Sequence, residues 1–353
     1  MKTSAINPNR IQTALVLSFV LLWCGCSSGS KHSGLFAIMK NKKTGFIDRK
    51  GQITINPQFD NAAEFSEGLA VIGVGDKFGY INTKGEFVIN PQFEGADAFS
   101  DGLASVRVGK KFGFIDRSGK IIISPQFDLA QNFIDGLCAV SISEKWGVID
   151  RSGKYIIPPQ FQDVRPFIDG LAAVKNESNK FGFIDKTGKV VIPYQFENVG
   201  IWYYLFTDTP TGWPLAVQVG EKWGFIDKSG KYVVNPQFED ANSFHEGLAS
   251  VKVDGKYGYV DTGGRFVINP QFESAQFFSD GLAPVSVGGK SGFIDKSGKY
   301  VINPQFESAS VFFDGLSSVM IKGKDEKFMT GYIDETGKFV FGPVEIELEG
   351  DEE

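Results

Sequence analysis

Aspartates recur at one position along this chain, and regularly spaced carboxylates can bind a cation or act as paired acids. Asp48, Asp116 and Asp227 each open a four-residue stretch that ends in glycine, and Asn82 replaces the aspartate in one copy. Calcium needs several oxygens that converge on one centre. An aspartate at the first position of a turn also accepts hydrogen bonds from the amides that follow. Because each aspartate has its own turn to cap, we interpret these carboxylates as structural.

Other reactive side chains are scarce. The histidines are His32, in a polar segment, and His245, at a variable loop position. A Ser, His and Asp arrangement needs a positioned base, and we find no zinc spacing, phosphate loop or dinucleotide fingerprint. A carbohydrate-active enzyme would need two carboxyl groups about 5 to 10 Å apart, and candidates such as Asp163 or Asp208 have no supporting pattern. We therefore expect no catalytic residue, metal ligand or cofactor.

The cysteines near the N-terminus suggest lipidation. Lys2 and Arg10 precede an apolar run, 11–23, that is too short to span a bilayer and fits the core of a secretory signal. The run continues into Cys24-Gly25-Cys26, which resembles a bacterial lipoprotein signal with Cys26 as the acylated residue. An ordinary signal peptide with incidental cysteines is the alternative.

Acyl chains on Cys26 would hold the protein at a membrane, since each buried methylene contributes about 0.8 kcal/mol. We assign 1–25 to the signal and 26–33 to a flexible tether. No aspartate follows Cys26, so the outer membrane or the cell surface is the expected location. The third cysteine, Cys138, stands where related stretches have alanine and is expected to be a buried apolar thiol.

The turn aspartates belong to a repeat whose core reads GFID or a close variant. Nine copies begin at glycines spaced 34, 34, 34, 35, 42, 34, 34 and 39 residues apart: Gly45, Gly79, Gly113, Gly147, Gly182, Gly224, Gly258, Gly292 and Gly331. Self-similarity at such a period indicates stacked copies of one supersecondary unit. The 33 Phe and 42 Gly, with repeated turn signals, favour an all-β chain.

Within one copy, alternation and turn residues predict a three-stranded meander over 103–108, 112–116 and 120–123. Pro125 is expected to end the third strand because it lacks an amide donor. Phe127, Ala130 and Phe133 recur three residues apart and predict one helical turn that caps the unit. Gly113, inside a strand, is expected to lie beneath an aromatic ring from a neighbouring strand.

Two copies carry a recognisable signature. Lys145 to Asp150 reads KWGVID and 222–227 reads KWGFID, with GL before it, as at Gly136, and PQF after it, as at 236–238. These motifs resemble the WG-repeat (KWG) family over roughly residues 34–344. The resemblance implies a bacterial β-repeat protein, often surface-associated, and it supplies no catalytic residues.

The aromatic position of this signature weakens toward both ends of the chain. Its occupants are Thr44, Phe78, Phe112, Trp146, Phe181, Trp223, Tyr257, Ser291 and Thr330. Atypical terminal units are expected of an open array with exposed ends. The sequence therefore predicts an open, twisted β-solenoid over 34–344, followed by an acidic tail, 345–353. A closed β-propeller is the alternative.

The longest interval between copies contains an aromatic insert. Its Trp202, Tyr203, Tyr204 and Trp213 could stack on a partner or a sugar ring. Alternatively, the loop folds back and buries these rings.

The net charge of −6 gives no electrostatic footprint for nucleic acid. We therefore expect a non-catalytic, lipid-anchored envelope protein that binds protein partners or acts as a scaffold. Binding of cell-wall glycan is the first alternative, and a carbohydrate-active enzyme is a weaker one.

Overall fold

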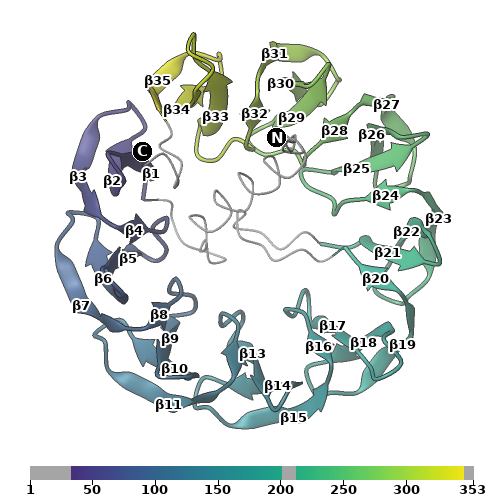
Figure 1. Ribbon diagram of the computed structural model, residues 1–353. Helices are drawn as coiled ribbons and strands as arrows, with labels where there is room; N and C mark the ends of the chain where they lie inside the picture. Colours follow the sequence, from purple (N-terminus) through teal and green to yellow (C-terminus); the bar gives the residue numbers. More distant parts are fainter. Residues whose placement is uncertain (1–32, 201–211, 346–353) are drawn as a thin grey trace, which may run out of the picture.

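The computed structural model describes residues 33–200 and 212–345, and this part of the chain forms nine antiparallel sheets in a ring (Figure 1). Each sheet is one blade of a β-propeller, and its strands follow one another from the centre of the ring outwards. The prediction of an all-β chain of short tandem antiparallel units is confirmed. The predicted open solenoid is wrong, and the propeller alternative is the observed architecture.

Blade 1 has three described strands, and each of the other eight blades has four. The strands of blade 1 are β1 (Leu35–Lys40), β2 (Lys43–Asp48) and β3 (Ile53–Phe59). The inner strands of blades 2 to 9 are β4 (Asn61–Ala62), β8 (Gly95–Ala96), β12 (Leu129–Ala130), β16 (Asp163–Val164), β20 (Asn198–Val199), β24 (Asp240–Ala241), β28 (Ser274–Ala275) and β32 (Ser308–Ala309).

The first long strands of blades 2 to 9 are β5 (Leu69–Val74), β9 (Leu103–Val108), β13 (Leu137–Ile142), β17 (Leu171–Lys175), β21 (Leu215–Val219), β25 (Leu248–Val253), β29 (Leu282–Val287) and β33 (Leu316–Lys322). The second long strands are β6 (Lys77–Asn82), β10 (Lys111–Asp116), β14 (Lys145–Asp150), β18 (Phe181–Asp185), β22 (Lys222–Ile226), β26 (Lys256–Asp261), β30 (Lys290–Asp295) and β34 (Phe328–Asp334). The outer strands are β7 (Phe87–Phe93), β11 (Ile121–Phe127), β15 (Tyr155–Phe161), β19 (Val190–Phe196), β23 (Tyr232–Phe238), β27 (Phe266–Phe272), β31 (Tyr300–Phe306) and β35 (Phe339–Glu345).

The segment that follows the third predicted strand is extended. The expectation that Pro125 ends this strand is wrong, because β11 runs through Pro125 to Phe127. The expected helical turn is also wrong, because Leu129–Ala130 pairs with β13 as the inner strand of the next blade. Proline is tolerated because β11 is an edge strand of its sheet. One repeat of sequence therefore contributes to two blades.

The glycine of the repeat signature makes room for backbone. A Cβ on Gly113 would lie 2.5 Å from the Ile123 carbonyl oxygen and 2.7 Å from the Pro125 nitrogen, where the pairing of β10 with β11 shifts register. The corresponding carbonyl contact is 2.5 to 2.8 Å in all nine copies. The expectation of a covering aromatic is therefore wrong, since the outer strand itself presses on this glycine.

The hydrophobic core lies between the blades. The Phe114 ring of blade 3 packs against Phe133 of blade 4, with centroids 4.9 Å apart, and the Tyr80 ring of blade 2 packs against Phe99 of blade 3 at 4.8 Å. All four side chains are essentially inaccessible to solvent. Burying such a ring stabilises the fold by roughly 1.5–3 kcal/mol. Each blade thus requires a neighbour, as the repeat argument predicted.

The ring is closed by contacts between blade 9 and blade 1. The Phe36 and Tyr332 rings are 5.7 Å apart, and the Arg49 Nε donates to an Asp314 carboxylate oxygen at 2.8 Å. The small residue at the signature position of blade 1, Thr44, is only 1% exposed. Loss of the aromatic at that position therefore does not mark an exposed end, which is why the open array was predicted wrongly.

Blade 1 has no inner strand among the described residues, and side chains take its place. In blade 2, the Val71 carbonyl accepts a hydrogen bond from the Ala63 amide. The equivalent carbonyl in blade 1, that of Ala37, accepts from the Tyr332 hydroxyl at 2.9 Å, and the Ala37 amide donates to Glu64 Oε1 at 2.9 Å. We call these two contacts the Ala37 clamp. They join blades 9 and 2 to blade 1.

Candidate functional site

The two faces of the ring differ in how closely the repeats agree. The turns between the second long strand and the outer strand, such as 116–119, lie at one end of each blade, which we call the turn face. Leu103 pairs with Asp116, so the first long strands also begin there. Hairpin tips between the two long strands form the opposite, hairpin face. The turns share Asp or Asn at the first position and Gly at the fourth, whereas no residue is common to all the tips at either position: Asn41-Lys42, Gly75-Asp76, Gly109-Lys110, Ser143-Glu144 and Gly220-Glu221. The hairpin face is therefore the better candidate for specific recognition.

The turn aspartates cap their own turns, as predicted. Asp116 Oδ1 accepts hydrogen bonds from the Ser118 and Lys120 amides at 2.9 and 3.1 Å. The Ser118 hydroxyl donates to the same oxygen at 2.6 Å, and this bond is the main reason that the pKa of Asp116 is lowered. The pattern recurs at Asp150 and Asp227. These carboxylates stabilise turns and do not converge on a shared centre.

A second set of repeated carboxylates lies on the hairpin face and was not singled out from the sequence. Glu94, directly after outer strand β7, accepts from the Gly109 amide at 3.1 Å and from Lys77 Nζ at 2.9 Å. Lys77 belongs to blade 2 and Gly109 to blade 3, so the carboxylate joins two blades. Asp60 and Asp128 repeat the arrangement. The signal was available, because an acidic residue follows most PQF motifs.

A third set lies where the inner loops meet the first long strands on the turn face. Asp101 Oδ2 accepts from the Gly136 amide of the next blade at 2.8 Å, and Asp280 does the same for Gly315 at 2.9 Å. The members of this set are Glu67, Asp101, Asp135, Asp169, Glu246, Asp280 and Asp314. These carboxylates connect neighbouring blades.

At most junctions, a basic residue at the second turn position of the following blade faces the acid of the third set. Lys228 pairs with Asp169 at 3.2 Å, and Lys296 pairs with Glu246 at 3.1 Å. Two junctions have neither the acid nor the base. Ser33 stands in the acid's position opposite Thr83, and Trp213 stands there opposite Thr262. The junction between blades 8 and 9 departs from the pattern, with Asp280 facing a turn that carries Glu335.

No catalytic centre is assembled from the predicted candidates within 33–200 and 212–345. Asp163 forms an ion pair with Arg165 at 3.1 Å, and Asp208 and His32 lie outside the described residues. The His245 ring stacks on Phe277 at 4.1 Å, and burial lowers its pKa to about 4. The described residues contain no group of three or more His, Cys, Asp or Glu side chains placed to hold a metal ion.

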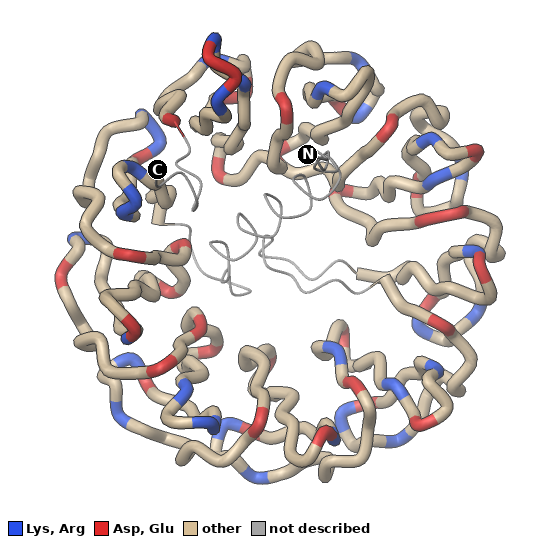
Figure 2. The backbone as a smooth tube through the Cα atoms, viewed as in Figure 1, with Lys and Arg blue, Asp and Glu red and all other residues tan. Residues whose placement is uncertain are grey.

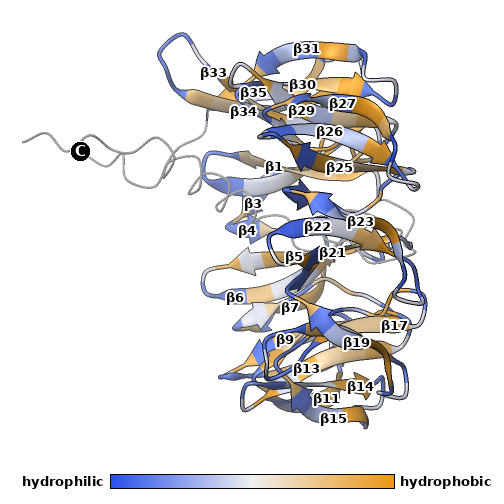
Figure 3. Cartoon of the chain, turned by 90° about the vertical axis from the view of Figure 1, so that its right-hand side faces the viewer, coloured by the Kyte–Doolittle hydropathy of each residue, from blue (hydrophilic) through white to orange (hydrophobic). Residues whose placement is uncertain are grey.

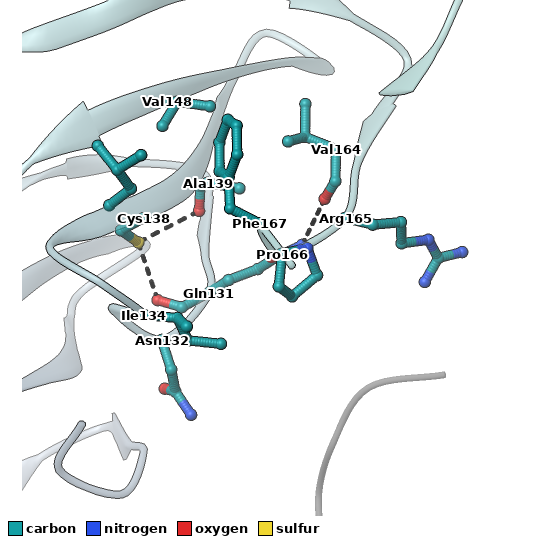
Figure 4. Close-up of a pocket in the computed structure, with 11 residues that line it drawn as sticks. Gln131, Asn132, Ile134, Cys138, Ala139, Val148, Val164, Arg165, Pro166 and Phe167 are labelled. Atoms are coloured by element: carbon teal, nitrogen blue, oxygen red, sulfur yellow. Dashed lines mark hydrogen bonds between the residues drawn. The ribbon is translucent and has the colours of Figure 1, made fainter. Parts of the chain in front are cut away.

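Cys138 lies beside a small hollow between blades 4 and 5 (Figure 4). Its side chain is 1% exposed, and its thiol donates to the Gln131 carbonyl at 3.0 Å. Burial raises the pKa of this thiol well above its ordinary value. The hollow has a volume of about 10 Å³, which is room for about one water molecule. The expectation of a buried apolar thiol is confirmed, and the hollow is too small for an organic ligand.

Trp213 is the one predicted binding aromatic among the described residues. Its ring packs on Phe183 with centroids 5.5 Å apart, in a core cluster with Phe196 and Leu215. In other blades a loop phenylalanine, such as Phe244, fills this place. Trp213 therefore has a packing role at the junction of blades 5 and 6.

The remaining predicted site residues, Trp202, Tyr203, Tyr204 and Cys26, lie outside the described residues. The signal, 1–25, most of the tether, and the tail beyond Glu345 also lie outside them.

Comparison with known families decides the repeat assignment. A model described as "WG containing repeat" matches eight segments: 45–78, 78–112, 112–146, 146–180, 181–204, 223–257, 257–290 and 292–324. The chain belongs to the WG-repeat family. The resemblance drawn from KWGVID and KWGFID is thus confirmed, and the matches follow the period of the blades.

This WG-repeat protein is similar to several solved structures, and the first one below, with a TM-score above 0.5, supports its fold. A crystal structure of a eukaryotic initiation factor matches with 12% identity and a TM-score of 0.63, over 88% of this chain and 96% of that chain. The computationally designed Ika8 protein matches with 11% identity and a TM-score of 0.46, over 88% and 100%. BamB from Moraxella catarrhalis matches with 12% identity and a TM-score of 0.42, over 81% and 97%. A comparison with curated proteins gives no match.

The outer strands of the WG-repeat propeller begin with exposed apolar residues next to the turn face. Phe87 and Val88 are 49% and 42% exposed, although the Phe87 ring also contacts Phe59 of the preceding blade. We call the set of such residues the apolar rim: Ile53, Phe87, Val88, Ile121, Ile122, Ile156, Val190, Val191, Val233, Phe266, Val267 and Val301. Figure 3 shows apolar segments on these outer strands. Among the described residues, no helix is long and apolar enough to cross a membrane.

Proposed function

We propose that this WG-repeat propeller is a non-catalytic binding or scaffold module for a protein partner at the cell envelope. An acylated Cys26 holds it at the outer membrane or the cell surface, with 26–33 as the tether. The partner binds the hairpin face. The ring supplies a rigid platform, and the tips supply the specific contacts.

One observation carries this proposal: the recurrent carboxylates hold the ring together, while the side chains that differ between blades gather on the hairpin face. Asp116 caps a turn, Glu94 joins two blades, and Asp101 reaches the next blade's glycine amide. Lys and Arg are interspersed with Asp and Glu around the ring (Figure 2), so no blade presents charge of one sign alone. A surface of varied tips on a fixed frame suits recognition of one protein partner.

The longest tip adds contact area to this face. Strands β33 and β34 are seven residues long and continue to Lys322 and Phe328, and their hairpin projects beyond the other blades (Figure 3). The Lys322 and Glu326 side chains form an ion pair at its end. A projecting, charged hairpin provides polar contacts of the kind found at the rim of protein interfaces.

The test is photo-crosslinking in intact cells from Glu221 or Lys324 on the hairpin face, each replaced by a photoreactive residue. We expect a discrete protein adduct from at least one position. The variant Asp76→Lys/Glu144→Lys, which leaves both probe positions in place, should reduce that adduct severalfold, whereas Glu335→Lys on the turn face should leave it unchanged. A glycan adduct, or the same adducts in both variants, would refute binding of a protein through these tips.

A further inference from the structure

The turn face carries an outer ring of basic side chains directly beside the apolar rim. In the repeat, Lys120 stands between the turn glycine and the apolar pair Ile121 and Ile122. The exposed Lys and Arg of the turns are Arg49, Lys50, Lys84, Arg117, Lys120, Arg151, Lys154, Lys186, Lys189, Lys228, Lys231, Arg265, Lys296, Lys299 and Lys338. We call these fifteen residues the basic ring. Basic side chains next to apolar ones are typical of surfaces that lie in the membrane interface.

The carboxylates of the same face match the basic side chains in number, but they lie in different places. The turns themselves contain ten: the exposed Glu86 and Glu335, and eight turn aspartates that cap backbone amides, such as Asp116. The acids of the third set, such as Asp101, lie where the inner loops enter the blades and are bound to the next blade. The position after the turn glycine, directly before the apolar rim, is Lys or Arg in seven of the nine copies and is acidic only at Glu86. Positive charge therefore borders the apolar rim, although the ten turn carboxylates and the seven of the third set outnumber the fifteen basic side chains.

The chain also enters the ring on the turn face. Leu35, the first residue of β1, pairs with Asp48, the first residue of a turn. Glu345 ends the outer strand β35 at the opposite, hairpin face. Cys26 lies nine residues before Leu35, which corresponds to at most about 30 Å of extended chain. An anchor on Cys26 would therefore hold the turn face close to the bilayer.

We propose that the turn face of the ring lies against an anionic membrane surface, with the basic ring on the lipid headgroups and the apolar rim in the interfacial layer. This inference rests on the anchoring proposed above and adds an orientation to it. Each basic residue near an anionic surface is attracted to it, and the exposed apolar side chains add area to bury. The hairpin face then points away from the membrane, toward the partner.

The experiment compares the distance of the two faces from lipid. The full chain is reconstituted into vesicles of phosphatidylethanolamine and phosphatidylglycerol that carry a headgroup-attached quencher. A fluorescent residue replaces Lys186 on the turn face or Glu221 on the hairpin face. We expect the probe at 186 to be quenched at least about twofold more strongly than the probe at 221. Equal quenching, or stronger quenching at 221, would overturn the orientation.

Matched variants test the role of the basic ring. Neutralising three of its members, in Lys120→Gln/Lys154→Gln/Lys189→Gln, should remove most of the difference between the two probes. The same charge change on the hairpin face, in Lys40→Gln/Lys110→Gln/Lys222→Gln, should leave it intact. If both variants behave like the unmodified chain, the basic ring does not orient the protein.

Acylation of Cys26 is measured separately, from the mass of the N-terminal peptide. A chain without acyl groups would refute the proposed anchoring. The quenching comparison, made on chain bound to the same vesicles from solution, would still report which face is nearer the lipid. Conversely, an acylated chain with equal quenching at both faces would refute the orientation alone.

Discussion

The Ala37 clamp makes the stability of the ring depend on the protonation of Glu64. Glu64 is 8% exposed, and burial raises the pKa of its carboxyl from 4.5 to about 7, although the hydrogen bond from the Ala37 amide acts in the opposite direction. Between these two pH values the folded chain holds a proton that the unfolded chain has lost. Folding stability from this group is therefore complete below about pH 4.5 and declines as the pH rises through 7. The total loss is about 3 kcal/mol, because one pKa unit corresponds to 1.36 kcal/mol.

Glu64→Gln keeps an acceptor oxygen for the Ala37 amide and removes the titration. We expect the free energy of unfolding of this variant, minus that of the unmodified chain, to rise by about 3 kcal/mol between pH 4.5 and pH 8. Urea unfolding followed by tryptophan fluorescence at several pH values measures this difference. His245, whose lowered pKa makes the fold gain stability from about pH 4 to 6.5, contributes equally to both chains and cancels.

A difference that stays flat across this pH range would refute the reasoning. It would mean that Glu64 is solvated in the folded chain and does not replace the inner strand of blade 1. Glu64→Ala, which removes the acceptor, should destabilise the ring at every pH.

Three further changes test the packing and the junctions. Trp213→Ala should lower the free energy of unfolding by about 3–5 kcal/mol in urea titration, because it empties the place beside Phe183; an unchanged value would reopen a binding role. Gly113→Ala should cost about 1–3 kcal/mol in the same assay, because its methyl group meets backbone 2.5 Å away. A double-mutant cycle on Arg49→Ala and Asp314→Ala should give a coupling of about 1 kcal/mol, since the Arg49 side chain is 58% exposed although that of Asp314 is only 12% exposed. A coupling of several kcal/mol would contradict a pair whose arginine is open to solvent.

Local signals predicted the unit of the fold but not all of its strands. The alternation in 103–108 and the turn at Asp116 depend on neighbours in sequence, so both were predicted correctly. Leu129–Ala130 is two residues long, too short for a period-two pattern to be seen. Its pairing with β13 is set by the blade that follows and not by its own residues.

Closure of the ring depends on the total rotation from blade 1 to blade 9. This total is the sum of the rotations between neighbouring blades, and no single repeat determines it. Two signals of closure were nevertheless present in the sequence. Glu64 is acidic where other copies have Ala98 or Asn132, and Arg49 and Asp314, at opposite ends of the chain, complete the pattern of acids and bases found at most inner junctions.

From the sequence, the structural role of the repeated carboxylates could be predicted, but the location of the candidate site could not. The sequence indicated that its carboxylates are structural, and the hydrogen bonds of Asp116 and Asp227 confirm this. It could not indicate that Trp213 replaces the loop phenylalanine at a blade junction, because that position lies beside an irregular insert. Nor could it separate the hairpin face from the turn face before the strand directions were known.

The account depends most directly on the anchor at Cys26. Mass spectrometry of the N-terminal peptide from the protein isolated from its native membranes tests it. We expect the peptide to begin at Cys26 and to carry acyl chains. An unmodified peptide that contains both Cys24 and Cys26, or an N-terminus created by cleavage beyond Cys26, would contradict the proposal that this ring works as a membrane-tethered binding module.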